Sequence, residues 1–279
     1  MPDLAPPRPA QPVLPLLPLL PLLSDLPRIG PGPQRPPGPS DVHIWHHPHR
    51  AGTAPEPTAA LLADLSPAER THAAGLRDNH RRQQFVVGRA LCRRVLSSYT
   101  PVPPQHWRFT LGSRGKPVIA APTLPAPLWF NLSHTDGASV CAVTGAGPDI
   151  GVDIEQKTRG PDTLEIAEQF FPQAELGQLR HLPPAQRDET FMRIWALKES
   201  YVKARETSLT DGIRGTAFDL TQPKNIRVTF HHPLHEQAQQ WRFHLHQLDP
   251  TRIVALSLRT HTPGPLKIQT GTAPSVRRG

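Results

Sequence analysis

Two short runs of this sequence bring three carboxylates together with basic side chains. In Gly-Val-Asp-Ile-Glu, Asp153 and Glu155 are two positions apart, so on a strand both would point from the same face. In Trp-Ala-Leu-Lys-Glu-Ser-Tyr-Val-Lys, Trp195, Glu199 and Lys203 are spaced by four, which aligns them along one side of a helix. A hard cation such as Mg²⁺ takes oxygen ligands and keeps phosphates in its shell, so carboxylates beside lysines suit a phosphate-bearing substrate.

Each run also has an ordinary interpretation. An Asp-x-Glu pair is more often a solvated strand end than a metal site. Glu199 and Lys203 could be a simple i,i+4 ion pair, which contributes roughly 0.3 to 0.5 kcal/mol. The functional interpretation depends on the two runs occurring in one chain.

Two further segments carry groups suited to an anionic ligand. Ser133 and His134 are neighbours on a predicted strand, so their side chains point to opposite faces and cannot readily share a proton. We expect a phosphate contact there, although a histidine at a strand end is more often a structural hydrogen-bonding group. Gly115, Lys116 and Pro117 predict a turn that presents a cation beside a glycine, where a backbone can approach a ligand closely.

Other ligand-binding patterns are weak or absent in the sequence. The histidines at 46–49 and 231–235 lack a paired cysteine or a His-Glu-x-x-His frame, which argues against zinc. The P-loop and dinucleotide-binding glycine signatures are missing. Five arginines on a predicted helix are most simply a solvated face, although some could reach an anionic cofactor. They are Arg81, Arg82, Arg89, Arg93 and Arg94.

The elements that must position these residues occur in the same order twice. Hydrophobic periodicity predicts a first set and a second set of elements. The first has a strand at 42–45, helices starting near Thr58 and Asp78, and strands at 107–111, 128–132 and 138–144. The second has a strand at 150–154, helices at 163–171 and 185–205, and strands at 226–230, 241–248 and 252–258. This order predicts an α+β chain of two similar halves.

Composition separates the two ends of the chain from its core. Residues 1–40 hold 14 of the 36 prolines, which predicts a disordered or polyproline-like leader, and 263–279 reads as a flexible tail. The halves of the core are expected at 41–149 and 150–262. The net charge of the 279-residue chain is +8, but that of the core is only +4, with 25 Lys and Arg against 21 Asp and Glu. A mildly basic core favours an anionic partner and is weak evidence for nucleic acid.

Cysteine use and hydropathy favour a cytoplasmic protein. Cys92 and Cys141 are too few for a disulfide scaffold. No apolar run approaches the roughly 20 residues that span a bilayer. The leucine-rich stretch 13–23 is interrupted by three prolines, so it is neither a regular helix nor the continuous apolar centre of a signal peptide. We therefore expect no membrane association.

In their order and separation, these motifs resemble the Sfp-type 4'-phosphopantetheinyl transferase family. The likeness runs from Leu65 to Leu209, and its specific part is Gly-Val-Asp-Ile-Glu followed by Trp-x-x-Lys-Glu-x-x-x-Lys. It implies two pseudosymmetric halves, each a small antiparallel sheet packed with helices, with coenzyme A bound between them in a monomer. It also implies transfer of the phosphopantetheine arm of coenzyme A to a serine of an acyl or peptidyl carrier protein, with release of 3',5'-ADP.

The resemblance also implies a role for each matching residue. Asp153, Glu155 and Glu199 match the Mg²⁺ ligands, Lys203 matches a lysine that contacts the phosphates, and Lys198 matches the lysine before it.

The remaining matches concern the nucleotide and the serine. Gly115, Lys116 and Pro117, together with Ser133 and His134, match the segments that hold the nucleotide and its phosphates. Glu175 matches a glutamate that helps to deprotonate the carrier serine, although a metal-bound water could also act as base. The catalytic residues expected from the resemblance are therefore Glu199, Lys203 and Glu175.

The sequence departs from the family pattern at two places. Glu206 and Ser208 stand where relatives usually have two glycines, which predicts a less pliable loop after Lys203. Near the first helix, relatives often have basic residues for the ribose 3'-phosphate, whereas this chain has Glu69, Arg70 and His72. Arg70, Arg81 or Arg82 could substitute for those basic residues. The alternative is therefore a non-catalytic relative that binds coenzyme A or a carrier protein. A nucleic-acid-binding module rests on charge alone, because aromatic residues are not interleaved with the basic ones.

Overall fold

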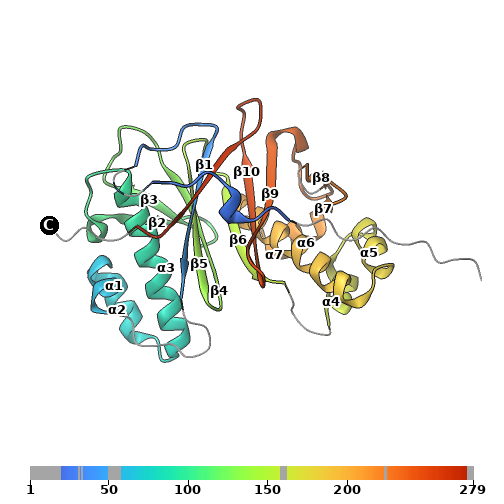
Figure 1. The fold of residues 1–279 in the computed structure, drawn as a ribbon, viewed down its shortest axis with the longest axis horizontal. Helices are drawn as coiled ribbons and strands as arrows, with labels where there is room; N and C mark the ends of the chain where they lie inside the picture. The colour runs from blue at the N-terminus through green and yellow to red at the C-terminus, as the bar shows by residue number, and fades with distance from the viewer. Residues whose placement is uncertain are drawn as a thin grey trace, which may run out of the picture.

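Two sheets pack against each other in the middle of the molecule, and helices lie on their outer sides (Figure 1). The computed structural model describes residues 20–30, 32, 34–49, 58–157, 162–222 and 225–274. The N-terminal half of the fold begins with a strand and ends with a hairpin of two long strands. Its elements are β1 (Asp41–Pro48), α1 (Ala59–Asp64), α2 (Pro67–Gly75), α3 (Asn79–Ser98), β2 (Arg108–Leu111), β3 (Pro117–Ala121), β4 (Trp129–Thr135) and β5 (Ala138–Thr144).

The second half repeats this succession and adds one strand at its end. Its elements are β6 (Ile150–Gln156), α4 (Thr163–Phe170), α5 (Gln173–Arg180), α6 (Pro184–Arg205), α7 (Leu209–Gly215), β7 (Thr216–Asp219), β8 (Arg227–Phe230), β9 (Trp241–Asp249), β10 (Arg252–Arg259) and β11 (Lys267–Thr272). Three short 3₁₀ helices occur at Leu23–Asp25, Pro104–His106 and Ala238–Gln240.

Strand order shows that the two halves are built alike. The first sheet has the order β11-β1-β5-β4 and the second has the order β6-β10-β9, so β1, β5 and β4 correspond to β6, β10 and β9. Each set of three is antiparallel. The short hairpins β2–β3 and β7–β8 correspond as well. The prediction of an α+β fold with two pseudosymmetric halves is confirmed, and β11, which runs parallel to β1, is an addition to it.

Local sequence signals account for where the helices begin. Ser66 and Glu69 form a capping box at α2, in which each side chain accepts a hydrogen bond from the other residue's backbone N–H, and Pro67 occupies the first turn. Asp78 accepts two backbone hydrogen bonds at the start of α3. The helix expected from Thr58 consists of two, because the chain is extended at Leu65 and Ser66 between α1 and α2.

Buried apolar side chains fill three layers. The layer between α3 and the first sheet contains an apolar stripe whose residues recur at helical spacing, Leu91, Cys92, Val95, Leu96 and Tyr99, and this spacing is what predicts a helix after Asp78. A second layer lies between the two sheets. The third lies between the second sheet and α6. Representative residues are Leu91, Val95 and Phe130 in the first layer, Ile44, Val152 and Leu256 in the second, and Phe191, Leu197 and Ala255 in the third.

Two of the five arginines of α3, Arg93 and Arg94, do not belong to the solvated face expected for them, whereas Arg81 is exposed. Arg93 is 2% exposed, and its Nε lies 2.7 Å from a carboxylate oxygen of Glu69. Arg94 pairs with Asp64 at 2.6 Å. The expectation was wrong for these two residues because α1 and α2 pack on that side of α3 and supply carboxylates to it.

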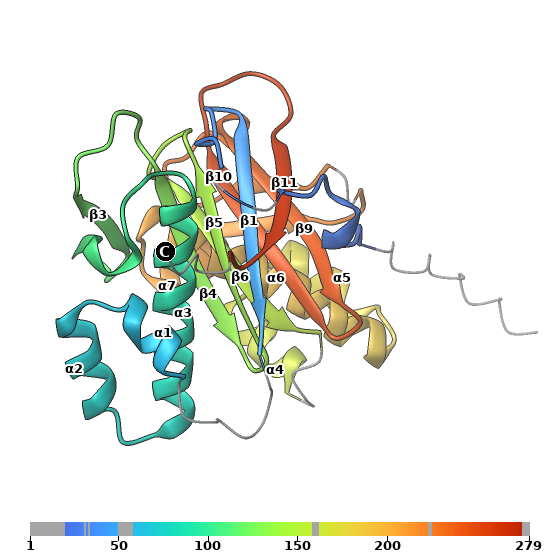
Figure 2. The same cartoon turned by 60° about the vertical axis from the view of Figure 1, so that its left-hand side comes forward.

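Both ends of the chain contribute to the fold, which corrects the expected leader and tail. Within 1–40, Leu23 is 1% exposed, and two isolated β-bridges tie Leu22 to Gln247 and Arg28 to Thr270. Within 263–279, β11 lies along β1, as Figure 2 shows. The start of the leader, 1–19, and the last five residues lie outside the described residues. The described part of the leader thus lies along β9 and β11, each the outermost strand of its sheet.

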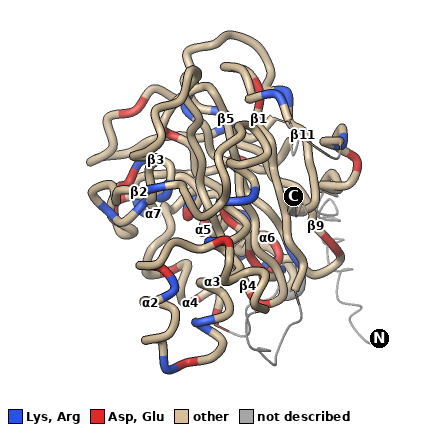
Figure 3. Tube along the Cα trace, turned by 90° about the vertical axis from the view of Figure 1, so that its left-hand side faces the viewer, with Lys and Arg blue, Asp and Glu red and all other residues tan. Residues whose placement is uncertain are grey.

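The charge distribution and the helix lengths bear on the partners. Lys and Arg alternate with Asp and Glu over the face shown in Figure 3, rather than collecting in one basic stripe. None of the helices in the described ranges is both long and apolar enough to cross a membrane.

Candidate active site

Three carboxylates meet where α6 crosses β6. Asp153 and Glu155 come from β6 and Glu199 from α6, and one oxygen of each lies within 4.8 Å of the others. Asp153 is 2% exposed, while Glu155 and Glu199 are partly exposed. Among the described residues this is the one group of three acidic, cysteine or histidine side chains close enough to hold a metal ion. The structure therefore brings the predicted metal ligands together.

A glycine allows the helix to come this close to the strand. A β-carbon on Gly151 would overlap the carbonyl oxygen of Ser200 and lie 2.6 Å from the backbone nitrogen of Ala204. Because Gly151 has no side chain, α6 packs directly on β6, which places Glu199 and Lys203 over Asp153. Sequence reasoning missed this role, although the glycine precedes the acidic pair in the same motif.

Lys203 and Ser133 complete a hydrogen-bonded group with Asp153. The Nζ of Lys203 donates to Asp153 Oδ1 at 2.5 Å and to Ser133 Oγ at 2.9 Å, and Ser133 Oγ donates to the same carboxylate oxygen at 2.9 Å. Burial disfavours the charged ammonium, but the carboxylates of Asp153, Glu199 and Glu155 outweigh that effect and raise the pKa of Lys203 above its usual value. The lysine is therefore a firmly protonated cation at the carboxylates.

The site has an unused hydrogen-bond acceptor. The second oxygen of Asp153, Oδ2, is buried and accepts no hydrogen bond from the described residues. Lys203 interacts with all three carboxylates, and a buried unpaired carboxylate oxygen costs several kcal/mol unless a cation compensates it. Carboxylate and hydroxyl oxygens are the ligands that a hard divalent cation prefers, so the residues present fit such an ion.

His134 lies next to this group, at the exposed end of β4. Partial burial lowers the pKa of its imidazole first, and the positive charge of Lys203 lowers it further. The ring is therefore neutral at pH 7 and can donate one hydrogen bond to an anion without carrying charge. Ser133 and His134 face opposite sides of the strand, as predicted, and Ser133 is the one that contacts Asp153.

Lys116 makes different contacts from those expected of it. Its Nζ donates to the carbonyl oxygens of Pro148 at 2.6 Å, Ile150 at 2.8 Å and Ala204 at 3.5 Å. Burial is the main cause that lowers its pKa, to about 8. The lysine thus ties the β2–β3 hairpin to the start of β6 and the end of α6. Gly115, at φ +83°, forms the tight turn that was predicted before it.

Lys116 lines a cavity of about 270 Å³ at the junction of the two halves. The hairpin and β4 contribute Ser113, Pro117, Trp129 and Phe130, and the second half contributes Pro148, Asp149, Ala204, Arg205 and Glu206. The cavity adjoins the last turn of α6, which carries Lys203. Gly115 lies in the turn at its edge, so the three residues of the Gly-Lys-Pro motif stay together beside this cavity.

Lys198 and Glu175 do not join the carboxylates, which corrects two expectations. The Nζ of Lys198 is 2.8 Å from Glu175 and donates to the carbonyl oxygens of Ile213 and Thr216. Lys198 and Glu175 are 0% and 1% exposed. A second oxygen of Glu175 accepts the backbone N–H of Phe218 at 2.7 Å. This pair holds α5, α6 and α7 together, and its burial leaves a carrier serine no access to Glu175.

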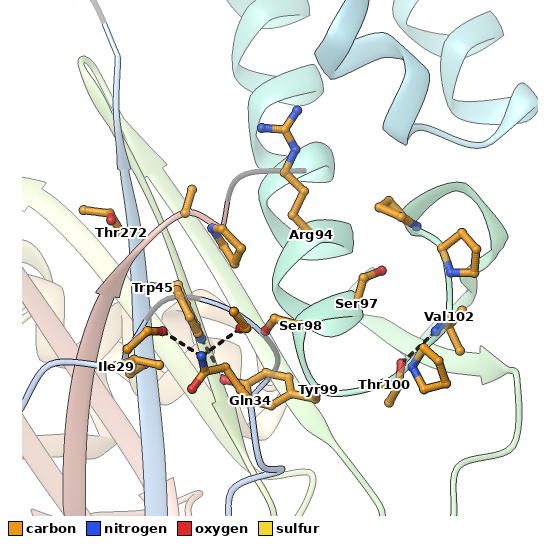
Figure 4. Close-up of a pocket in the computed structure, with 17 residues that line it drawn as sticks. Ile29, Gln34, Trp45, Arg94, Ser97, Ser98, Tyr99, Thr100, Val102 and Thr272 are labelled. Atoms are coloured by element: carbon orange, nitrogen blue, oxygen red, sulfur yellow. Dashed lines mark hydrogen bonds between the residues drawn. The ribbon is translucent and has the colours of Figure 1, made fainter. Parts of the chain in front are cut away.

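A larger cavity lies elsewhere, beside the C-terminal end of α3 (Figure 4). Its volume is about 870 Å³, but its polar groups already have partners within the protein. Tyr99 accepts a hydrogen bond from Trp45, Ser97 from Trp107, and Arg94 pairs with Asp64. Without converging groups free to bind a ligand, this cavity lacks the chemistry of the carboxylate site.

The fold and the site thus combine two pseudosymmetric α+β halves with a group of three carboxylates that could hold a metal ion. Residues 149–257 match the family model of the 4'-phosphopantetheinyl transferase superfamily. This segment contains all three carboxylates.

Curated relatives agree with the family model. The chain is 35% identical over 165 residues to the 4'-phosphopantetheinyl transferase HetI of Nostoc sp., covering 59% of this chain and 68% of the relative. It is 30% identical over 173 residues to the 4'-phosphopantetheinyl transferase Sfp of Bacillus subtilis, covering 62% and 74%. It is 34% identical over 149 residues to AcpT of Salmonella typhimurium, covering 53% and 70%. The chain belongs to the 4'-phosphopantetheinyl transferase superfamily, whose enzymes transfer phosphopantetheine to carrier proteins.

Proposed function

We propose that this enzyme uses Mg²⁺ and coenzyme A, and that Asp153, Glu155 and Glu199 hold the ion. The observation that carries the proposal is the meeting of these three carboxylates, with the buried Asp153 Oδ2 left unpaired. A divalent ion bound there would neutralise charge on the pyrophosphate of coenzyme A during transfer. The ion's preference for oxygen ligands agrees with the side chains present.

The transferred group is the phosphopantetheine arm, and the acceptor is a serine of an acyl or peptidyl carrier protein. The serine Oγ forms a bond to the β-phosphorus of coenzyme A. The bond from that phosphorus to the bridging oxygen breaks, and 3',5'-ADP leaves with its electron pair. The serine proton passes to solvent. Positioning and electrostatic stabilisation do most of the work in such phosphoryl transfers.

The chain's own cations and donors give the pyrophosphate its contacts. Lys203 keeps its proton at neutral pH and stands beside the carboxylates, so it can contact phosphate oxygens as a full positive charge. Ser133 supplies a hydroxyl at the same place, and the neutral His134 supplies a ring N–H. We assign the nucleotide end to the cavity beside Lys116 and Pro117, because it adjoins the end of α6 and is lined by an aromatic pair, Trp129 and Phe130.

Monomeric, cytoplasmic action is part of the proposal. Every residue of the carboxylate site comes from β4, β6 and α6 of one chain, so no second copy is needed to complete it. Cys92 and Cys141 are buried and free, which agrees with a reducing compartment.

Mass spectrometry of an apo carrier protein incubated with the enzyme, coenzyme A and Mg²⁺ tests the proposal. We expect one phosphopantetheine arm on the carrier serine, and no gain with EDTA or with Asp153→Ala. Glu168→Ala is the matched control, because Glu168 is an exposed carboxylate paired with Arg180 away from the site. If acyl and peptidyl carriers both stay unmodified while coenzyme A still binds, the non-catalytic alternative is correct.

A further inference from the structure

Helix α6 ends on a residue in an unfavourable backbone conformation. Glu206 has φ 50° and ψ 40°, and among the described residues it is the one non-glycine residue with positive φ. The left-handed region costs a non-glycine residue roughly 1 to 2 kcal/mol, which is why helices commonly end there on glycine. A glutamate at this position therefore needs a compensating contact.

The side chain of Glu206 reaches across to the first half of the molecule. Its Oε1 accepts the backbone N–H of Arg114 at 3.2 Å, in the turn between β2 and β3. A β-carbon on Gly112 would overlap the carboxylate, with Oε2 only 2.6 Å away. The turn itself is closed by Gly112 N donating to Lys116 O at 2.8 Å. The carboxylate thus rests against the turn, and glycine at 112 makes room for it.

The same turn is held at a second point. Lys116 donates to backbone carbonyl oxygens at the start of β6 and the end of α6, as described above. Glu206 and Lys116 both line the cavity at the junction of the halves. The hairpin is therefore fastened to the second half at two points beside that cavity.

The cavity is small for the ligand assigned to it. At about 270 Å³ it lies just below the roughly 300 to 1,000 Å³ of typical small-molecule sites. A nucleotide bearing several phosphates would also meet the negative charge of Glu206 there. Size and charge both indicate that this arrangement of the turn restricts entry.

We propose that Glu206 is a latch that holds the 112–115 turn over the cavity and weakens binding of the nucleotide end of coenzyme A. Coenzyme A would bind after the hydrogen bond between Glu206 and Arg114 opens, so its apparent affinity is reduced by the fraction of closed molecules. This inference rests on the proposed assignment of the nucleotide end to the cavity. In this proposal Glu206 sets the affinity for coenzyme A and has no part in holding the ion.

Two substitutions at Glu206 separate its charge from its contact. Glu206→Gly removes the side chain and suits the positive φ, whereas Glu206→Gln keeps an acceptor for Arg114 and removes only the charge. We expect Glu206→Gly to lower the KM for coenzyme A about tenfold, the effect of a closed fraction near nine-tenths, with kcat changed less than about twofold. Glu206→Gln should lower the KM by less. Glu168→Gln is the matched control and should change neither.

A substitution on the other side of the contact gives an independent test. Gly112→Ala should displace the carboxylate without altering Glu206, and so lower the KM in the wild-type background. In the Glu206→Gly background it should have no further effect, because the group it clashes with is gone. Hydrogen exchange measured by mass spectrometry on free protein should show faster exchange over 111–116 in Glu206→Gly and in Gly112→Ala.

The outcomes distinguish the latch from the proposed function. If the KM for coenzyme A is unchanged or higher in Glu206→Gly and Gly112→Ala, or if exchange over 111–116 is unchanged, the latch is wrong. If the wild type binds coenzyme A but transfers nothing, the transfer reaction is wrong. The latch is then upheld by a lower Kd for coenzyme A in both variants, measured by calorimetry, and refuted by an unchanged one.

Discussion

The long helices of the two halves are braced in the same way. In the first half, the buried Arg93 of α3 pairs with Glu69 of α2 and donates to the carbonyl oxygens of Pro104 and Trp107. Its guanidinium also lies 5.0 Å from the ring centre of Phe109 on β2.

The second half repeats the arrangement with different residues. The buried Lys198 of α6 pairs with Glu175 of α5 and donates to the carbonyl oxygens of Ile213 and Thr216. It lies 5.8 Å from the ring centre of Phe218 on β7. In both halves a buried cation joins the long helix, the helix before it and the segment leading to the short hairpin. We call each of these groups, Arg93 with Glu69 and Lys198 with Glu175, a brace.

The halves differ at the corresponding strands β1 and β6. On β1, His43 and Trp45 both bond to the hydroxyl of Tyr99, at 2.8 and 2.7 Å, so the polar atoms there are paired within the protein. On β6, the corresponding face carries Asp153 and Glu155, and a buried carboxylate oxygen is left unpaired. The comparison teaches that the brace belongs to the scaffold, while the group of carboxylates that can hold a metal ion occurs, among the described residues, on β6 and α6 of the second half.

The largest expected effect concerns the carboxylates at β6. Asp153→Asn keeps the size of the side chain and its hydrogen bond to Ser133 but removes the charge. We expect kcat/KM for carrier modification to fall about 1,000-fold, equivalent to about 4 kcal/mol of transition-state stabilisation. Titrating Mg²⁺ in the assay should show that the variant needs a higher Mg²⁺ concentration for half-maximal activity. A loss smaller than about threefold would show that the charge of Asp153 is not needed.

The next effect tests whether the two braces are structural equivalents. Lys198→Met leaves Glu175 buried and unpaired, so we expect the free energy of unfolding to fall by about 3 kcal/mol. The double variant Glu175→Gln with Lys198→Met should recover most of this loss, because no uncompensated charge remains. Urea unfolding measures both values.

Arg93→Met is the matched variant in the first half. It should also destabilise the protein, with a smaller loss because Glu69 is 14% exposed. At a temperature where all variants are folded, it should leave the KM for Mg²⁺ unchanged, whereas Lys198→Met should raise it. Equal effects on this KM would show that α6 has no special role in placing Glu199.

A third prediction concerns His246, a buried histidine on β9 of the second sheet. His246 is 5% exposed, neither ring nitrogen has a hydrogen-bond partner among the described residues, and burial lowers its pKa to about 4. Between pH 6.5 and about 4 the unfolded chain binds a proton that the folded chain does not, so stability falls as the pH falls through this window. His246→Phe should remove up to about 3 kcal/mol of that dependence. Urea titrations at pH 7 and 5 measure it, and an unchanged pH slope would contradict the prediction.

The smallest expected effect concerns the encounter with the carrier. The described charges are mixed rather than gathered into one basic face, so charge complementarity to an acidic carrier should be modest. We expect kcat/KM for the carrier to fall about threefold between 50 and 500 mM salt, with kcat unchanged. A rate indifferent to salt would count against a basic docking surface.

Motif spacing predicted the centre of the site well. Two carboxylates on one strand face and a carboxylate with a lysine on one helix side follow from the periods of strands and helices, and the structure joins them. The stripe of α3 was predictable for the same reason. What spacing could not show is the crossing of α6 over β6 at Gly151, because that depends on two segments distant in sequence.

The wrong expectations share a physical cause. Lys198, Glu175 and Arg93 are charged residues that a sequence reader assigns to a ligand or to solvent, yet each finds its partner on another helix. β11 was missed because Lys-Ile-Gln-Thr-Gly-Thr has little apolar alternation of its own. Its place is provided by the free edge of β1 and by the leader, whose Pro27 O accepts the N–H of Thr270.

That position of β11 has a consequence for how the protein is made. The first strand of the first sheet appears early in synthesis, but its parallel neighbour is encoded at 267–272. The N-terminal half therefore cannot complete its sheet until residues 267–272 have left the ribosome, and the edge of β1 stays without its parallel neighbour until then. More than two hundred residues separate the two strands that lie side by side in this sheet.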